Sequence, residues 1–182
     1  YTTAHTLSLH DALPISHLYT SLQDLFNDFI ISDEENIGRP NIYWRLVRPL
    51  EESDVGPLHC DSWFWHLNNN FGYPKKKYQR TKVWVDIHTE RGLSGLLLVD
   101  NSHVNKDVRY KSVFMDGINK PRLVENENIS QPTLAITNPG NAILFNDNLL
   151  HGGSINKGMT TRVTFEFTIL EAIPPKITGF MV

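Results

Sequence analysis

Short runs of apolar, β-branched and aromatic residues recur along this chain, and Gly, Pro, Asn or Asp bounds each of them. Runs of this length and composition are typical of β-strands. Several such strands in one chain favour a β-sandwich or β-barrel over a helical bundle. The sequence therefore predicts a mainly β fold, with strands at residues 42–50, 82–88, 95–100, 133–137, 141–145 and 162–170.

The last of these runs alternates strictly between apolar and polar residues. Successive side chains of a strand point to opposite faces, so the two sets separate. One face is predicted to join the core, and the other to meet water or a polar cavity. The apolar set is Val163, Phe165, Phe167 and Ile169, and the polar set is Arg162, Thr164, Glu166 and Thr168.

One segment near the start has helical periodicity instead. Apolar residues recur there at spacings of three and four, from Leu18 to Ile30. This spacing predicts an amphipathic helix over residues 18–31 that packs on the β-rich part.

Two further segments connect the predicted strands. Residues 138–141 read Asn-Pro-Gly-Asn, which is typical of a type II turn that leads into the strand at 142–145. Residues 101–127 have weak periodicity and many polar residues, so we expect a long excursion that covers a site.

The first residues require separate treatment. Residues 5–15 match the translation of a sequencing-library adapter, and the chain begins without Met. We therefore expect residues 1–16 to be non-native and exclude them from the reading of function. The remaining 182 − 16 = 166 residues suffice for one domain. Residues 17–182 are accordingly expected to form a single domain whose natural N-terminus was longer.

Composition excludes several classes of function. A formal net charge of −3 gives no electrostatic case for binding nucleic acid or an anionic membrane. The single cysteine rules out an internal disulfide framework. The sequence has no apolar run of about 18 residues, the length that would be read as a transmembrane helix. The default expectation is a cytoplasmic protein with a small-molecule substrate.

The stretch Pro-Leu-His-Cys-Asp at 57–61 carries the first candidate site. In a strand, His59 and Asp61 would point the same way, and Cys60 would point to the opposite, core side. An imidazole and a carboxylate in this spacing can hold a metal ion, although the pattern alone is a weak signal. His66 is a rival ligand with a less regular spacing.

His151 strengthens this interpretation. It ends an apolar strand and precedes two glycines, which allow the backbone to turn closely around a ligand. Two imidazoles and one carboxylate form the facial triad of non-haem Fe(II) oxygenases. The alternative is that His59 and His151 are hydrogen-bonded core histidines.

Arg162 lies 162 − 151 = 11 residues beyond His151, with Thr164 on the same strand face. A guanidinium fork suits a bidentate grip on a carboxylate, which a 2-oxo acid cosubstrate needs. The alternative is that Arg162 pairs with Glu166 or faces solvent. Arg45, on another predicted strand, is a candidate for contact with an anionic substrate or for a surface ion pair.

Taken together, these segments resemble the phytanoyl-CoA dioxygenase-like branch of Fe(II)- and 2-oxoglutarate-dependent oxygenases. The matching pieces are "GPLHCD", "VWVDIHTERGLSGLLLVDNSH" and "LLHGGSINKGMTTRVTFEF", and the resemblance covers residues 42–170. It implies a cupin-like double-stranded β-helix, or jelly roll, with the N-terminal helix added to it.

The resemblance also implies roles for individual residues. His59, Asp61 and His151 would hold Fe(II), Arg162 would bind the C5 carboxylate of 2-oxoglutarate beside Thr164, and Trp84 would line the cosubstrate pocket. The implied reaction uses O2 to hydroxylate a small organic substrate and releases succinate and CO2.

Two positions depart from the family pattern. The family's Pro-Gly pair before Ser102-His103 is Asp100-Asn101 here, which concerns the shape of the substrate loop. The small hydroxyl residue often found two after the distal histidine is Gly153, which removes one hydrogen bond to the cosubstrate.

Two other functions fit the same residues. A cupin-like Zn or Mn enzyme could use the triad for hydrolysis or isomerisation. A jelly-roll module could bind a ligand without catalysis. Neither needs a carboxylate clamp at Arg162.

Overall fold

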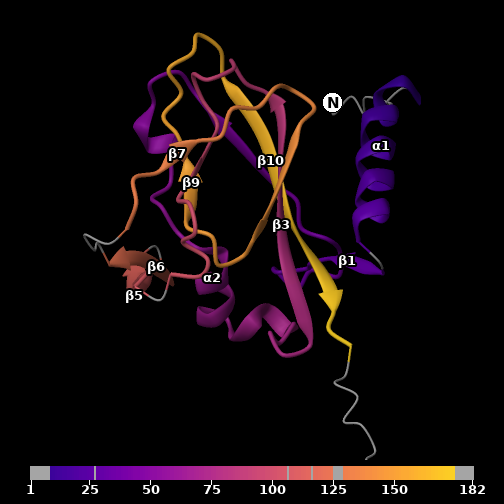
Figure 1. Cartoon of the computed structure of the whole chain (residues 1–182), viewed down its shortest axis with the longest axis vertical. Coiled ribbons are helices and arrows are strands. Elements are labelled where there is room, and N and C mark those ends of the chain that lie inside the picture. The colour runs from indigo at the N-terminus through magenta and orange to yellow at the C-terminus, as the bar shows by residue number, and fades with distance from the viewer. Residues whose placement is uncertain (1–8, 27, 106, 116, 125–128, 175–182) are drawn as a thin grey trace, which may run out of the picture.

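The computed structural model describes residues 9–26, 28–105, 107–115, 117–124 and 129–174. It consists mainly of antiparallel strands, and in the described part no helix is long and apolar enough to cross a membrane. Figure 1 shows helix α1 on one side of the strands and the β5–β6 hairpin on the other. The expectation of a mainly β fold is confirmed.

The largest sheet has five strands. β10 (Arg162–Ala172) pairs with β3 (Tyr78–His88) along one edge and with β1 (Phe29–Ile31) and β2 (Tyr43–Val47) along the other. β8 (Ala142–Asn146) pairs with the far side of β3. All these pairs are antiparallel.

Two smaller sheets complete the fold. β4 (Leu96–Leu98) lies between β7 (Thr133–Leu134) and β9 (His151–Gly153), and β5 (Arg109–Met115) pairs with β6 (Ile118–Val124) in a hairpin. α2 (Asp61–Leu67) and two short 3-10 helices at Glu52–Asp54 and Asn69–Gly72 connect the strands. The small sheet carries His151 on β9.

All the predicted strand regions contain strands, and the excursion predicted at residues 101–127 contains two further strands that were not predicted. It contains the β5–β6 hairpin, in which seven residue pairs are in register from Arg109↔Val124 to Met115↔Ile118. Its two strands alternate poorly because their faces are only partly buried. The predicted turn is present, with Gly140 at a φ of 91° and Asn141 N–H donating to the Asn138 carbonyl over 3.0 Å.

The predicted helix at 18–31 ends earlier than its periodicity indicates. Helix α1 spans Leu9–Leu25, and residues 29–31 instead form β1, which pairs with residues 169–171 of β10. Backbone pairing with an existing strand outweighs helical propensity here. Leu22 still packs against the sheet in a cluster with Val83 and Phe167, as the predicted stripe requires.

Helix α1 begins inside the segment that the sequence indicates to be adapter-derived. The assignment of residues 1–16 concerns the origin of the chain, so it stays a prediction. Residues 1–8 lie outside the described residues.

The polar face of β10 is buried rather than exposed. Thr164 and Thr168 are at most 1% exposed, and Arg162 and Glu166 at most 9%. Thr168 lies opposite Lys82, and Glu166 opposite Trp84, on β3. The expected polar cavity therefore lies on this face of the sheet, while the apolar face packs under α1.

Leu150 offers a test of the core next to this cavity. It is 0% exposed, and it packs with Cys60, Trp63 and Val99. Leu150→Ala is expected to lower the free energy of unfolding by about 2–5 kcal/mol, because it leaves a cavity in a packed core. Leu46→Ala is the control, since Leu46 is 60% exposed. Equal urea midpoints for the two variants would contradict this account of the core.

Candidate metal and cosubstrate site

His59 and His151 are brought together by the backbone. The two residues form an antiparallel bridge in which each N–H donates to the other's carbonyl, over 2.8 and 2.9 Å. Their ring centroids lie 4.6 Å apart. Residues separated by 92 positions (151 − 59) are thus paired side by side.

Asp61, the third candidate ligand, is the first residue of helix α2. The predicted strand geometry for 59–61 is wrong, because Cys60 is the N-cap of α2 and Asp61 is its first residue. An acidic residue in the first turn is favoured by the helix dipole. Cys60 still faces away from the group into the core, with 1% exposure, as predicted.

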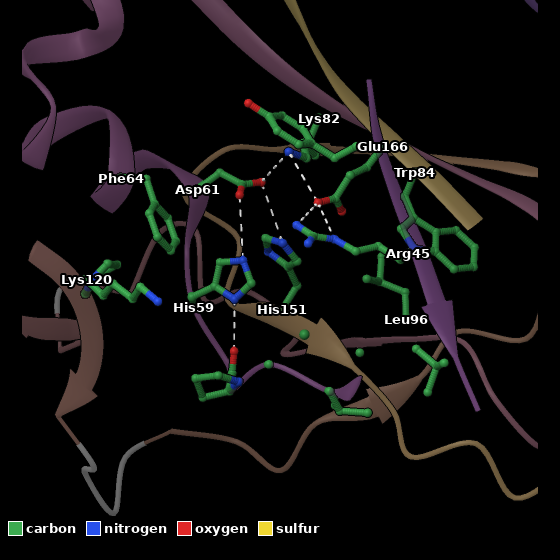
Figure 2. A pocket seen from close by; sticks show the side chains of 18 of the residues that line it. Arg45, His59, Asp61, Phe64, Lys82, Trp84, Leu96, Lys120, His151 and Glu166 are labelled. Atoms are coloured by element: carbon green, nitrogen blue, oxygen red, sulfur yellow. Dashed lines mark hydrogen bonds and ion pairs between the residues drawn. The ribbon is translucent and has the colours of Figure 1, made fainter. Parts of the chain in front are cut away.

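The three side chains converge on a common centre (Figure 2). One ligand atom from each of His59, Asp61 and His151 lies within 4.8 Å of the others, so the group can hold a metal ion. Asp61 Oδ1 is 3.7 Å from His59 Nε2, and Asp61 Oδ2 is 3.6 Å from His151 Nε2.

In both histidines, Nδ1 forms a hydrogen bond with a backbone carbonyl, which leaves Nε2 as the nitrogen that can bind a metal. His59 Nδ1 lies 2.9 Å from the Pro57 carbonyl, and His151 Nδ1 lies 2.8 Å from the Leu149 carbonyl. A carbonyl only accepts hydrogen bonds, so each Nδ1 carries the proton and donates it. Nε2 of each ring therefore remains available to a metal and faces Asp61, as in metal-binding histidines.

The carboxylate of Asp61 lies beside a lysine and the two imidazoles, with Lys82 Nζ and His151 Nε2 each 3.6 Å from its Oδ2. Its Oδ2 is buried and has no hydrogen-bond partner among the described residues. Burial alone would raise the pKa of Asp61, but Lys82, His151 and His59 lower it. Burial also lowers the pKa of His151 to about 4, which keeps this ring neutral. A buried anion facing two Nε2 atoms fits a bound metal cation.

The triad lies in a cavity of about 530 Å³, and Arg162 and Trp84 also line it. Arg162 donates through Nη1 to the Gly95 carbonyl over 2.6 Å and to Ser94 Oγ over 3.1 Å. No hydrogen bond joins it to Glu166 in the described part, so the alternative of an Arg162–Glu166 ion pair is not observed. Burial lowers the pKa of Arg162 to about 10.

Two buried hydrogen-bond donors on β10 lack hydrogen-bond partners among the described residues. Arg162 Nε and Thr164 Oγ1 are buried, and neither has a hydrogen-bond partner among the described residues. Thr164 is not among the residues that line the cavity, whereas Arg162 is. Trp84 is 2% exposed and packs with Leu96 and Phe145, so it belongs to both the core and the cavity wall.

The two departures from the family pattern have local explanations. Asn101 adopts a φ of 57°, a left-handed conformation that Asn tolerates where the family pattern has Gly. Ser102 Oγ accepts a hydrogen bond from Leu150 N–H over 2.8 Å and so supports the residue before His151. A Cβ at Gly153 would lie 3.0 Å from Arg162 Nη2, so glycine leaves room for that guanidinium.

The aromatic run after Asp61 divides between core and cavity. Trp63 is 5% exposed and packs in the core, whereas Phe64 and Trp65 line the cavity. The Phe64 ring lies against His59 at a centroid distance of 5.5 Å. His66, the rival ligand, is exposed and does not belong to the triad.

The sequence reading missed a group of charged residues beside the triad. Lys82 and Glu166 are buried in the cavity wall, and Arg45 donates to Glu166 Oε1 over 2.6 and 3.1 Å. Arg45 is thus in an ion pair, but this pair lines the cavity. The alternation of β10 already placed Glu166 on the polar face, whereas nothing in the sequence marked Lys82.

No family model and no curated protein matches the sequence, but solved structures share its fold. An apo structure titled "non-heme monooxygenase; ThoJ" aligns with a TM-score of 0.59 at 13% identity. It covers 95% of this chain, which spans 65% of its length. EvdO2 from Micromonospora carbonacea var. aurantiaca, complexed with 2-oxoglutarate, aligns at 0.51 and 12% identity over 98% of this chain and 96% of EvdO2.

A third structure has the same fold. A variant of the iron and alpha-ketoglutarate-dependent endoperoxidase NvfI aligns with a TM-score of 0.51 at 12% identity, over 92% of this chain and 72% of its own. At these identities the likeness concerns the fold, which is that of non-heme oxygenases.

Metal binding at the triad is expected to stabilise the chain. A divalent ion that binds only the folded state at about 100 times its Kd adds about 2.7 kcal/mol to the free energy of unfolding. We expect Ni²⁺ or Mn²⁺ to raise the Tm measured by differential scanning fluorimetry, and EDTA to reverse the rise. A Tm that does not respond to these ions would contradict a metal site at His59, Asp61 and His151.

Proposed function

We propose that this chain is an Fe(II)- and 2-oxoglutarate-dependent oxygenase of the phytanoyl-CoA dioxygenase-like type, built on a jelly roll. The observation that carries the proposal is the triad: two Nε2 atoms face a buried carboxylate whose Oδ2 has no hydrogen-bond partner among the described residues. This donor set of two imidazoles and one carboxylate suits Fe(II) and leaves coordination positions open.

In this proposal, His59, Asp61 and His151 hold the iron. When bound, iron activates O2 at the expense of 2-oxoglutarate, so that a small organic substrate is hydroxylated and succinate and CO2 are released. The carbonyls of Pro57 and Leu149 orient the two rings by accepting their Nδ1 protons. The three ligands are thereby preorganised on backbone-paired elements.

Arg162 is the proposed anchor for the far carboxylate of 2-oxoglutarate. Its guanidinium lines the cavity, and its Nε is a buried donor without a hydrogen-bond partner in the described part. Trp84 and Leu96, which pack together, supply an apolar part of the same cavity wall. EvdO2, which shares the fold, is complexed with 2-oxoglutarate, and this supports the proposal that the cavity takes the same cosubstrate.

The proposed substrate enters on the side of His59. Phe64 from α2 and Lys120 from β6 face the cavity there (Figure 2), and Pro121 and Arg122 of β6 also line it. The β5–β6 hairpin therefore forms part of the cavity wall, in the segment predicted to cover a site. Aromatic and apolar groups beside a few polar ones are typical of small-molecule sites.

The experiment that tests this function uses visible absorption. Anaerobic addition of Fe(II) and then 2-oxoglutarate to the protein is expected to produce the weak metal-to-ligand band of the chelated cosubstrate. Succinate formation in the presence of O2 and ascorbate is the second readout. Folded, iron-loaded protein that shows neither band nor succinate would contradict the proposal.

The same experiment separates the two alternatives. Metal binding without any effect of 2-oxoglutarate would favour a cupin-like Zn or Mn hydrolase or isomerase. Metal binding without any catalytic turnover would favour a non-catalytic jelly-roll module that carries a vestigial or structural metal.

A further inference from the structure

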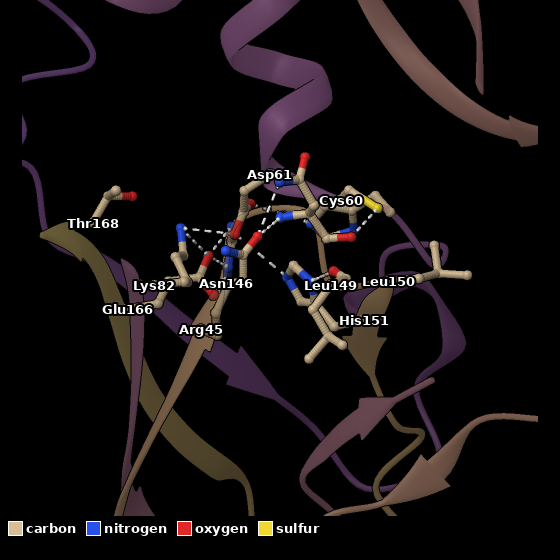
Figure 3. Close-up of polar contacts among 12 residues, drawn as sticks. Arg45, Cys60, Asp61, Lys82, Asn146, Leu149, Leu150, His151, Glu166 and Thr168 are labelled. Carbon is tan, nitrogen blue, oxygen red and sulfur yellow. Dashed lines mark hydrogen bonds and ion pairs between the residues drawn. The ribbon is translucent and has the colours of Figure 1, made fainter. Parts of the chain in front are cut away.

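A buried lysine lies beside the triad. The side chain of Lys82 is 5% exposed, and its Nζ is 3.6 Å from Asp61 Oδ2. The same Nζ is 4.0 Å from Glu166 Oε1. Dashed lines in Figure 3 join Lys82 to both carboxylates. Lys82 therefore contacts a proposed metal ligand without being in a position to coordinate a metal itself.

Asp61 is the main partner that compensates for the buried ammonium. Removing an ammonium from water is costly unless carboxylates offset the loss of hydration. Glu166 is already engaged by Arg45, whose Nε and Nη2 both donate to Oε1. Asp61 Oδ2 is closer to Lys82 and has no hydrogen-bond partner among the described residues. The Asp61 carboxylate thus forms an ion pair with Lys82 and is also a proposed metal ligand.

We propose that Lys82 is a positioning residue that holds the Asp61 carboxylate and sets the balance between metal affinity and cosubstrate affinity. Its fixed positive charge weakens the binding of a divalent cation and strengthens the binding of a dianionic 2-oxo acid. This inference rests on the proposed function, because it assumes that the triad holds a metal and that the cavity takes 2-oxoglutarate.

The charges around the triad explain the direction of both effects. Lys82 and Arg45 balance Asp61 and Glu166 in ion pairs, so the four side chains sum to zero. Arg162, the proposed anchor, adds one positive charge, so a divalent metal raises the sum to three and a bound dianion lowers it to one. Removal of Lys82 takes one positive charge from each state, which favours the metal and disfavours the dianion in a site with little water, where Coulomb interactions are strong.

Lys82→Met tests the inference, because methionine keeps most of the side-chain volume and removes the charge. Titration calorimetry with Ni²⁺ is expected to show a metal affinity about tenfold higher than that of the wild type. Titration of the anaerobic Fe(II) form with 2-oxoglutarate is expected to show a cosubstrate affinity about tenfold lower. A purely structural role would lower both affinities, and that result would overturn the inference.

Glu166→Gln is the second variant, and it tests the charge balance at the site if Lys82→Met does not fold. Loss of a negative charge is expected to lower the Ni²⁺ affinity and raise the 2-oxoglutarate affinity, which is the opposite pattern. Lys111→Met is the matched control, because Lys111 is exposed on β5 and does not line the cavity. Unchanged affinities in both cavity variants would also overturn the inference.

Failure of the inference and failure of the proposed function give different results. Wild-type protein that binds neither Ni²⁺ nor 2-oxoglutarate would refute the proposed function, and the inference with it. Wild-type protein that binds both, combined with a Lys82→Met variant that changes both affinities in the same direction, would refute the role of Lys82 alone.

Discussion

Asp61→Ala is expected to lower the affinity for Ni²⁺ or Fe(II) by more than about 100-fold. The change removes the only carboxylate of the triad and leaves two imidazoles as ligands. Loss of an outer-shell partner already costs about 10- to 100-fold in metal affinity, so loss of a direct ligand costs more. Titration calorimetry on the purified variant measures the effect.

The variant also removes the nearer partner of Lys82, so its fold needs a separate check. A buried charge left without its partner is destabilising by about 3–5 kcal/mol. Asp61→Asn, which keeps the volume, and circular dichroism separate loss of ligation from loss of folding. Asp24→Ala is the control, since Asp24 is exposed on α1. Metal affinity within about threefold of the wild type in a folded Asp61→Ala variant would remove the metal assignment.

Arg162→Met is expected to abolish 2-oxoglutarate binding while metal binding persists. The guanidinium is 4% exposed, so a carboxylate that pairs with it does so with little screening by water. A buried charge-assisted pair contributes about 2–5 kcal/mol when one partner is removed, which corresponds to a loss of at least about 30-fold in affinity. The visible band of the Fe(II) complex is expected to disappear at 2-oxoglutarate concentrations that saturate the wild type.

Arg162 also supports the backbone, and the controls allow for this. Its Nη1 donates to the Gly95 carbonyl, so methionine leaves that carbonyl without this donor. Arg162→Lys keeps the charge and loses the fork, and it is expected to retain part of the affinity. Arg109→Met, at an exposed position of β5, is the matched control. A folded Arg162→Met variant with an unchanged band would place the cosubstrate carboxylate elsewhere in the cavity.

Local patterns predicted most strands but not their partners. The alternation at 162–170 requires one buried apolar face, and β10 has it, with Phe167 and Ile169 under α1. The β5–β6 hairpin escaped prediction because its strands are only partly buried and show little alternation. The end of α1 was misplaced because residues 29–31 exchange helical hydrogen bonds for pairing with β10.

His59 and Asp61 were predicted to share a site because of strand geometry, and the structure brings them together in another way. The two side chains share a site because a bridge to β9 ends at His59 and a helix begins at Asp61. Their common direction thus comes from a change of backbone conformation and not from a period of two. The same residues would have been predicted from either geometry.

The sequence by itself predicted the mainly β class, the candidate metal ligands and Arg162 as a candidate anchor. These predictions need only the residue types and their spacing within short segments of the chain. Only the tertiary structure decided that His59 and His151 pair across 92 positions (151 − 59), and that Lys82 and Glu166 are buried beside Asp61. Whether a lysine faces water or a buried carboxylate depends on strand register and sheet packing. Those are set by contacts between distant segments, which no local pattern encodes.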